Sequence, residues 1–340
     1  MTMLKYAVPA LCLLAAPGLL AVPAFAQGAK KVDTMRVERL DPALDAVITP
    51  GTRVGRIAGG FGFVEGPMWK SGRLYFSDVA HNNIRALDRM ANVVVVLKAS
   101  GGLTNPPKGS NSGSNGLVTD KDGTILLTRM GIGTIERLDE KGGLKPFIAK
   151  YDGKRLNSPN DLVFARDGAL WFTDPSFGLL KMDADPKKEM KFNGVYRYAG
   201  GKLAAVITDM TQPNGLGFSP DGKTFYVSNS IPDSYLRAYD VGVDGKLSNM
   251  RVFYRWPKNS GDGVPDGLKI DSLGNIWATG AGGVSILSPK GKLIGKIVLP
   301  EVVANLTFAD DGKTVYLTAT SSIYQLGLKV PGQLPLYYRR

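Results

Sequence analysis

Short hydrophobic segments rich in aromatic and β-branched residues alternate with polar turns along most of the chain. Six pairs of such segments follow one plan: an Asn, Asp or Glu opens an apolar segment, a turn with glycine follows, and a second apolar segment ends the pair. Segments of this kind, bounded by glycine turns, are typical of β-hairpins. The opening residues are Glu65, Asn115, Asn160, Asn214, Asp266 and Asn305.

The six pairs keep a regular spacing. The turn glycine follows the opening residue by 7 or 8 positions, and successive opening residues are 39 to 54 positions apart. The intervals hold further short apolar segments, such as 84–88 and 93–98, so each unit has about four strands. Because such a unit cannot bury both of its faces alone, units arranged around an axis are expected. The pattern predicts an all-β six-bladed β-propeller. The alternative, two β-sandwich domains, would give a composition break near the middle of the chain, and the sequence shows none.

Closure of the ring requires a blade built from both ends of the repeat region. Residues 53–57 are the candidate closing strand beside 322–328. Closure would remove open sheet edges between the first and last units. We therefore place the propeller at 51–330, with an N-terminal extension over its outside at 27–50 and a C-terminal tail at 331–340.

The first 26 residues have the pattern of a cleavable signal peptide. Lys5 precedes an apolar stretch that ends in an A-x-A cleavage signal at 24–26. Three prolines interrupt this stretch, and it is short for a membrane span, which needs about 20 apolar residues. We expect cleavage after Ala26 and a periplasmic or secreted protein. Cleavage would remove Cys12, the one cysteine, so the mature chain would contain no disulfide.

Composition narrows the chemistry further. The chain has 42 Lys and Arg against 30 Asp and Glu, a formal net charge of +12. These cations are scattered singly in turns, which favours a solvated basic surface; we expect no nucleic-acid partner, and no membrane partner after removal of the leader. A single histidine, His81, excludes a zinc site of several imidazoles, and a Ser-His-Asp triad unless His81 is its base. We expect His81 at the surface or at a pocket rim.

The six opening residues carry the candidate chemistry. In a propeller they would lie at one end of the innermost strands and converge on the central channel. Two carboxylates and four amides supply oxygen ligands, which suit a divalent cation, with Ca²⁺ first and Mg²⁺, Mn²⁺, Zn²⁺ or Fe²⁺ as alternatives. Asn-Gly and Asp-Gly pairs are also common turn dipeptides. A glutamate in the same register, and separate Asp-Gly turns later in the units, favour the metal site.

More specific motifs surround these residues. They are 65–69 (EGPMW), 156–162 (LNSPNDL), 213–216 (PNGL), 265–270 (PDGLKI) and 304–308 (ANLTF). In order along the chain, they resemble the gluconolactonase/regucalcin family, and the resemblance extends from residue 36 to about 328. The resemblance implies a six-bladed propeller with a divalent metal in its channel, and lactone hydrolysis.

Carried over residue by residue, the resemblance implies that Glu65, Asn214 and Asp266 are metal ligands. It implies that Asn160 lies near the metal and the substrate, and we include Asn160 among the metal-binding and catalytic residues. Asp266 is the candidate base or proton carrier, with ligation alone as the alternative. Four further residues are candidates for substrate binding: Asn115, Arg129, Arg155 and Asn305.

These observations together predict a metal-dependent lactonase that hydrolyses aldonolactones such as gluconolactone, as a monomer or weak dimer. A metal would polarise the lactone carbonyl while water adds. Two alternatives stay open: a phosphotriesterase-like hydrolase of the same fold and a non-catalytic calcium-binding propeller. An insertion at 175–193 is either a lid over the channel or a surface loop.

Overall fold

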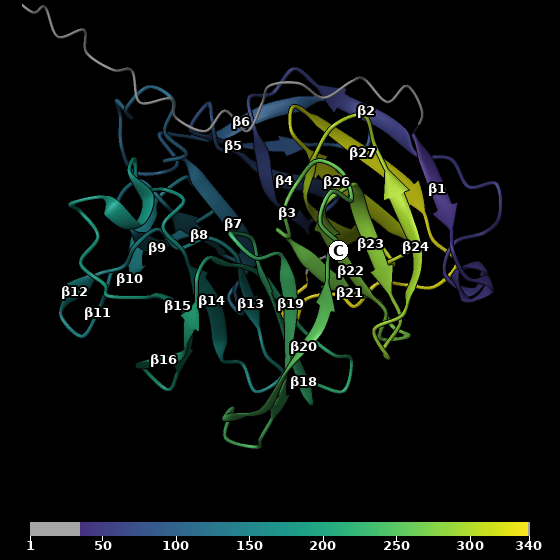
Figure 1. Ribbon diagram of the computed structural model, residues 1–340. Coiled ribbons are helices and arrows are strands. Elements are labelled where there is room, and N and C mark those ends of the chain that lie inside the picture. Colours follow the sequence, from purple (N-terminus) through teal and green to yellow (C-terminus); the bar gives the residue numbers. More distant parts are fainter. Residues whose placement is uncertain (1–34, 339–340) are drawn as a thin grey trace, which may run out of the picture. The chain divides into compact units, whose positions relative to one another are not determined.

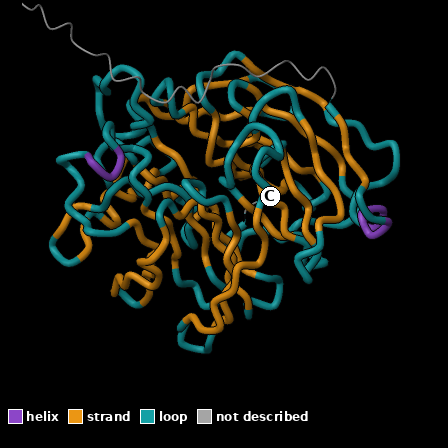
Figure 2. Tube along the Cα trace, in the orientation of Figure 1, coloured by secondary structure: helices purple, strands orange, loops and turns teal. Residues whose placement is uncertain are grey.

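The computed structural model describes residues 35–338, and β-strands dominate this part of the chain (Figures 1 and 2). Two short 3-10 helices, Pro42–Ala46 and Met182–Ala184, interrupt the strands. The predicted leader at 1–26 lies outside the described residues. Within the described part, no helix is long and apolar enough to cross a membrane.

Four antiparallel sheets have four strands each, in the order of the chain from the channel outward. The first has β3 (Val64–Lys70), β4 (Arg73–Asp78), β5 (Asn83–Leu87) and β6 (Val93–Lys98). The second has β7 (Ser114–Thr119), β8 (Ile125–Arg129), β9 (Thr134–Leu138) and β10 (Leu144–Ile148). The third has β13 (Leu162–Phe164), β14 (Leu170–Asp174), β15 (Asn193–Ala199) and β16 (Lys202–Met210). The fourth has β17 (Pro213–Phe218), β18 (Thr224–Asn229), β19 (Tyr235–Val241) and β20 (Leu247–Arg255).

The last two sheets include strands from the N-terminal part of the chain. The fifth has β21 (Leu268–Ile270), β22 (Ile276–Gly280), β23 (Gly283–Leu287) and β24 (Leu293–Val298), and β1 (Arg36–Arg39) pairs with β24 at its outer edge. The sixth has β25 (Val303–Ala309), β26 (Thr314–Ala319), β27 (Ser322–Gly327) and β2 (Gly55–Gly59). Between the second and third sheets in sequence is a small hairpin, β11 (Lys150–Tyr151) and β12 (Lys154–Arg155).

Pairing of β2 with β27 closes the ring. The predicted closing strand is therefore confirmed, although it begins two residues later than the apolar pattern indicated. The closure joins the start of the propeller to its last blade, so that neither edge of the ring is left open. Six sheets around a channel confirm the predicted all-β, six-bladed propeller (Figure 1).

Aromatic side chains fill the interfaces between blades. Trp69, Trp171 and Trp277 are at most 3% exposed. Each contacts a ring of a neighbouring blade, an arrangement that contributes about 0.5–1.5 kcal/mol beyond the burial of area. The pairs are Trp69–Tyr316 at 5.5 Å between centroids, Trp171–Phe218 at 5.4 Å and Trp277–Phe308 at 5.8 Å.

Candidate functional site

The six opening residues lie where the innermost strands begin, and we call them the channel ring. Glu65, Asn115 and Asn214 are the second residues of β3, β7 and β17. Asn305 is the third residue of β25, and Asn160 and Asp266 come two residues before β13 and β21. Since Asn115-Gly116 and Asn214-Gly215 lie within strands, the alternative that they form hairpin turns is excluded.

Burial separates one member of the channel ring from the others. Asp266 is partly exposed. The other five side chains are nearly inaccessible: Glu65, Asn115, Asn160, Asn214 and Asn305. Asp266 is therefore the most exposed residue of the ring, although its carboxyl is buried enough for its pKa to be raised.

The backbone ties neighbouring members of the ring together. Gly116 N–H donates to the Asn160 carbonyl at 2.8 Å, and Gly215 N–H donates to the Asp266 carbonyl at 3.0 Å. The glycines make this approach possible, because a Cβ on Gly215 would lie 2.2 Å from the Asp266 oxygen. Close contact between inner strands thus holds the ring side chains at fixed positions.

Hydroxyl groups add a second set of ties. Each belongs to the next-to-last residue of the second strand of a blade and donates to a carbonyl in the following blade. The bonds are Ser77 to Asn115 at 2.7 Å, Thr128 to Asn160 at 2.8 Å, Ser228 to Asp266 at 2.7 Å and Thr279 to Ala304 at 3.0 Å. This role was not predicted from the sequence, although the shared register of the hydroxyls is a signal that could have revealed it.

The carboxyl groups of the ring lie together. Glu65 and Asp266 lie close enough for the charge of Glu65 to raise the pKa of Asp266, and the nearby Asn214 amide lowers it. Glu65 Oε2 also accepts from Asn305 Nδ2 at 2.9 Å and from the Gly66 N–H. Burial raises the pKa of both carboxyls, and so does negative charge: Asp161 beside Glu65, and Glu65 and Asp161 beside Asp266. Without a cation, the pair favours sharing a proton.

Buried oxygens without hydrogen-bond partners point to a missing ligand. They are Glu65 Oε1, Asn115 Oδ1 and Asn214 Oδ1 in the ring and Asp161 Oδ2 behind it. Leaving such atoms unpaired is costly, and a hard cation would satisfy carboxylate and amide oxygens together. Within residues 35–338, no group of three or more His, Cys, Asp or Glu side chains could hold a metal. The amides are therefore needed, and the ring residues fit an ion such as Ca²⁺.

The two candidate arginines are engaged with protein atoms. Arg129 Nη1 donates to Glu136 at 2.6 Å, and its Nε donates to the Ser100 carbonyl at 2.9 Å. Arg155 donates to the carbonyls of Leu156, at 2.6 Å, and Gly131, at 3.3 Å. Both guanidinium groups thus fix loops, and their role in substrate binding stays a prediction.

His81 lies at the surface, as the sequence predicted, with half of its side chain exposed. Its Nδ1 is 2.8 Å from Asp78 Oδ2, which also accepts from Arg85 at 3.0 Å. These contacts give His81 a structural role at the end of β4.

The insertion at 175–193 is held against the start of β17. Gln212 accepts from the Ser176 N–H at 3.1 Å and donates to Asp183 Oδ2 at 3.1 Å. Gln212 is two residues from Asn214, so the insertion forms a wall beside the ring. That the insertion acts as a lid over the channel stays a prediction.

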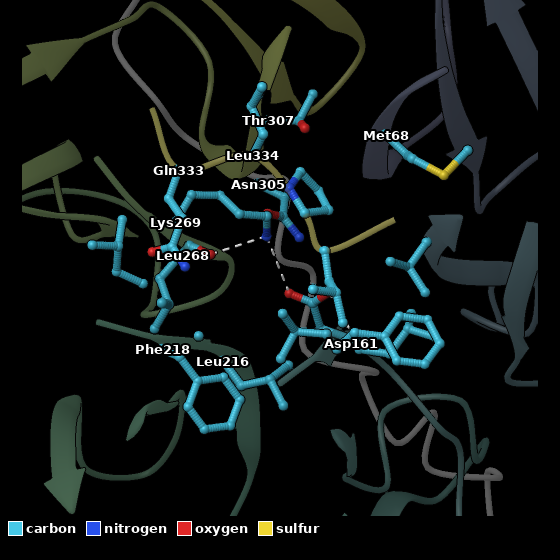
Figure 3. Close-up of a pocket in the computed structure, with 18 of the residues that line it drawn as sticks. Met68, Asp161, Leu216, Phe218, Leu268, Lys269, Asn305, Thr307, Gln333 and Leu334 are labelled. Atoms are coloured by element: carbon cyan, nitrogen blue, oxygen red, sulfur yellow. Dashed lines mark hydrogen bonds and ion pairs between the residues drawn. The ribbon is translucent and has the colours of Figure 1, made fainter. Parts of the chain in front are cut away.

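A cavity of about 370 Å³ lies behind the ring, along the inner strands (Figure 3). Its walls are mostly apolar, and Asp161, Lys269 and Asn305 supply polar groups among them. The C-terminal segment 333–336 lines the cavity too, and Gln333 N–H donates to the Ile270 carbonyl at 2.9 Å. Neither this position of the C-terminal residues nor the place of Asp161 and Lys269 was predicted from the sequence.

Comparisons with known proteins agree with this geometry. A family model described as "SMP-30/Gluconolactonase/LRE-like region" matches residues 63–321. A gluconolactonase of Zymomonas mobilis is 34% identical over 310 residues, with 87% of each chain covered. The diisopropyl-fluorophosphatase of Loligo vulgaris is 28% identical over 183 residues, which are 50% of this chain and 57% of the relative. The solved structure of a gluconolactonase from Xanthomonas campestris is 31% identical, with a TM-score of 0.77, and covers 87% of this chain and 96% of that chain.

Proposed function

The chain belongs to the SMP-30/gluconolactonase/LRE-like family, and on that premise we propose that it hydrolyses aldonolactones with one divalent cation bound at the channel ring. It is a hydrolase that acts on the ester bond of lactones. The resemblance carried by its ring motifs is thereby confirmed. Aldonolactones as substrates and dependence on a metal are the parts that we propose.

The unpartnered oxygens of the ring are the observation that carries the metal proposal. Glu65, Asn160, Asn214 and Asp266 would hold the cation, and Ca²⁺ suits a donor set of carboxylate and amide oxygens. A divalent cation bound there would supply Lewis-acid polarisation of the lactone carbonyl. We assign Glu65 to binding of the cation only, because it is buried and accepts hydrogen bonds from both Asn305 and Gly66.

Asp266 is suited to move the proton. Asp266 is the one residue of the ring that is partly exposed, so we expect a water molecule in the channel to reach its carboxyl. As the water oxygen adds to the lactone carbonyl carbon, its proton passes to the Asp266 carboxylate. The ester C–O bond then breaks, and the leaving ring oxygen takes the proton to give the hydroxy acid. The alternative, in which Asp266 only binds the cation, predicts the same ligands without this transfer.

Substitution of Asp266 tests the proposal. Asp266→Asn should keep the fold and lose most turnover of aldonolactones by protein loaded with Ca²⁺, while Asp262→Asn, at an exposed position in the preceding loop, should not. Circular dichroism and thermal unfolding of both variants verify that the fold is retained. Turnover by Asp266→Asn near that of the unmodified chain would contradict the assignment.

A second candidate function comes from the similarity to the squid diisopropyl-fluorophosphatase. The same ring would then act on a phosphorus centre in place of a carbonyl carbon. Parallel assays of aldonolactones and of an organophosphate fluoride on one preparation discriminate the two. Metal binding without turnover of either substrate would favour a non-catalytic propeller.

We also propose export of the chain to the periplasm or its secretion. The support is the apolar stretch and the A-x-A signal at 24–26. N-terminal sequencing of protein made in a bacterial host should give Gln27 as the first residue. A mature protein that retains the leader would overturn this proposal.

A further inference from the structure

Lys269 breaks the pattern of the inner strands. It is the third residue after the opening residue of its unit, and the other five units carry apolar residues or glycine at this register. These are Met68, Val118, Val163, Gly217 and Phe308. A lysine at this register faces the channel cavity, where it lines the wall.

Asp161 breaks the pattern in a second register. It directly follows the opening residue Asn160, where four of the other units have glycine and the sixth has Leu306. Asp161 is 4% exposed, and its Oδ2 lies 3.7 Å from Lys269 Nζ. Asp161 belongs to the third blade and Lys269 to the fifth, so the two exceptional residues meet across the channel (Figure 3).

Lys269 also contacts the channel ring. Its Nζ donates to Asn305 Oδ1 at 3.3 Å and to the Leu268 carbonyl at 3.0 Å. Together with Leu306 N–H, which donates to the same Oδ1 at 2.8 Å, the lysine orients the amide so that Asn305 Nδ2 donates to Glu65 Oε2 at 2.9 Å. Glu65 is thereby held with Oε1 free of hydrogen-bond partners. The contacts form a chain from the ammonium group through Asn305 to the proposed metal ligand.

The ionisable side chains around the ring carry a net charge that suits a divalent cation. Glu65, Asp161 and Asp266 are close enough for Asp161 to act electrostatically on both other carboxyls. Ionised, the three carboxylates carry three negative charges, and the Lys269 ammonium offsets one. The remaining two match one divalent cation.

We propose that Lys269 is a positioning residue of the metal centre, which fixes Asn305 and Glu65 and adjusts the charge of the ring to a divalent ion. This inference rests on the proposed function, because it assumes that the ring binds such an ion. It goes further by assigning to Lys269 the discrimination between divalent and trivalent cations.

The ratio of the affinities for Tb³⁺ and Ca²⁺ tests this role. Both affinities are measured by isothermal titration calorimetry on the full mature chain after removal of bound metal with a chelator. Loss of one positive charge near the ring favours the more highly charged ion, so Lys269→Met should raise the preference for Tb³⁺ by about tenfold. Lys269→Arg, which keeps the charge, should restore the ratio of the unmodified chain. Lys246→Met, at an exposed turn, is the control and should change nothing.

A double variant covers the case in which Lys269→Met does not fold because Asp161 is left without its counter-charge. Asp161→Asn with Lys269→Met removes one charge of each sign, so the ratio should return to that of the unmodified chain. An unchanged ratio of Tb³⁺ to Ca²⁺ affinity in folded Lys269→Met, or a changed ratio in the double variant, would overturn the role proposed for Lys269. The proposed function would not be affected by either result. Failure of the unmodified chain to bind Ca²⁺ would instead overturn the metal part of the proposed function.

Discussion

The carboxyl groups of Glu65 and Asp266, from the first and fifth blades, lie close together at the channel ring, where the charge of Glu65 raises the pKa of Asp266. Two carboxyls in contact cannot both be ionised cheaply, and burial raises the pKa of each further. A cation between them would take the place of the shared proton. Removal of either carboxyl should therefore abolish tight binding of a divalent ion.

Glu65→Gln tests this expectation through stability. A ligand that binds only the folded state stabilises it by about 2.7 kcal/mol at a concentration of 100 times Kd. Ca²⁺ should thus raise the melting temperature of the chelator-stripped chain, and Glu65→Gln should remove this effect. Glu140→Gln, at an exposed turn, should keep the full increase. An equal increase in Glu65→Gln would exclude Glu65 as a ligand.

The hydroxyl ties predict a coupling between the blade interface and the site. Thr128 donates to the Asn160 carbonyl, which also accepts from Gly116 N–H. Thr128→Val should therefore cost only about 1 kcal/mol of unfolding free energy, since the carbonyl keeps one partner. Because Asn160 loses one of its two hydrogen bonds from the second blade, we expect a several-fold loss of kcat/KM for aldonolactones.

Thr128→Ser is the matched control, because it keeps the hydroxyl and removes only a methyl group. Denaturant unfolding and lactonase kinetics should both place it near the unmodified chain. Equal activity of the valine and serine variants would show that the hydroxyl does not position Asn160.

The regular parts of this molecule were predictable from local pattern. The period of apolar segments predicted the blades and the closing strand, and the shared register of Glu65 and Asp266 predicted that they meet. Such features repeat in every unit, so a single sequence displays them several times.

The features that were missed depend on contacts between units. Asp161 and Lys269 are single departures from the repeat, and only the ring geometry brings them within 3.7 Å. Arg129 was a candidate for the substrate because its charge is visible in sequence, whereas its acceptors, Glu136 and the Ser100 carbonyl, depend on how the neighbouring segments fold. The C-terminal segment has no strand pattern, and its place at the cavity follows from packing against the finished ring.

That packing leads to a prediction about the C-terminus. Leu334 packs against the core cluster of the fifth and sixth blades, and Ser272 N–H donates to the Pro331 carbonyl at 3.0 Å. A chain that stops after residue 330 loses these contacts and opens the apolar cavity to water. It should melt several degrees lower and bind a hydrophobic dye such as ANS, whereas a chain that stops after residue 338 should do neither. Identical melting temperatures for the two chains would contradict a sealing role.

The Asp174 carboxyl predicts how stability depends on pH. It is fully buried and accepts the N–H groups of Asn157 and Ser158, both at 2.8 Å, in the segment that leads to Asn160. Burial raises its pKa to about 7, against the pull of those hydrogen bonds and of Arg155 and Lys188. Because the folded-state pKa is the higher one, the folded state holds a proton that the unfolded chain releases near pH 4. The stabilisation that Asp174 adds to the free energy of unfolding is thus complete below pH 4. It falls as the pH rises to 7, and the loss amounts to at most about 4 kcal/mol.

Asp174→Asn should flatten this part of the pH profile, because an amide does not titrate. At pH 5 the variant should be less stable by about 1–3 kcal/mol, since its single carbonyl oxygen cannot accept as well from two buried N–H groups. The difference from the unmodified chain should shrink toward pH 8, where the buried carboxylate is charged and costly. Urea unfolding at several pH values measures both effects, and Asp139→Asn, in a surface turn, supplies the control. Parallel profiles for Asp174→Asn and the unmodified chain would show that the pH dependence arises elsewhere.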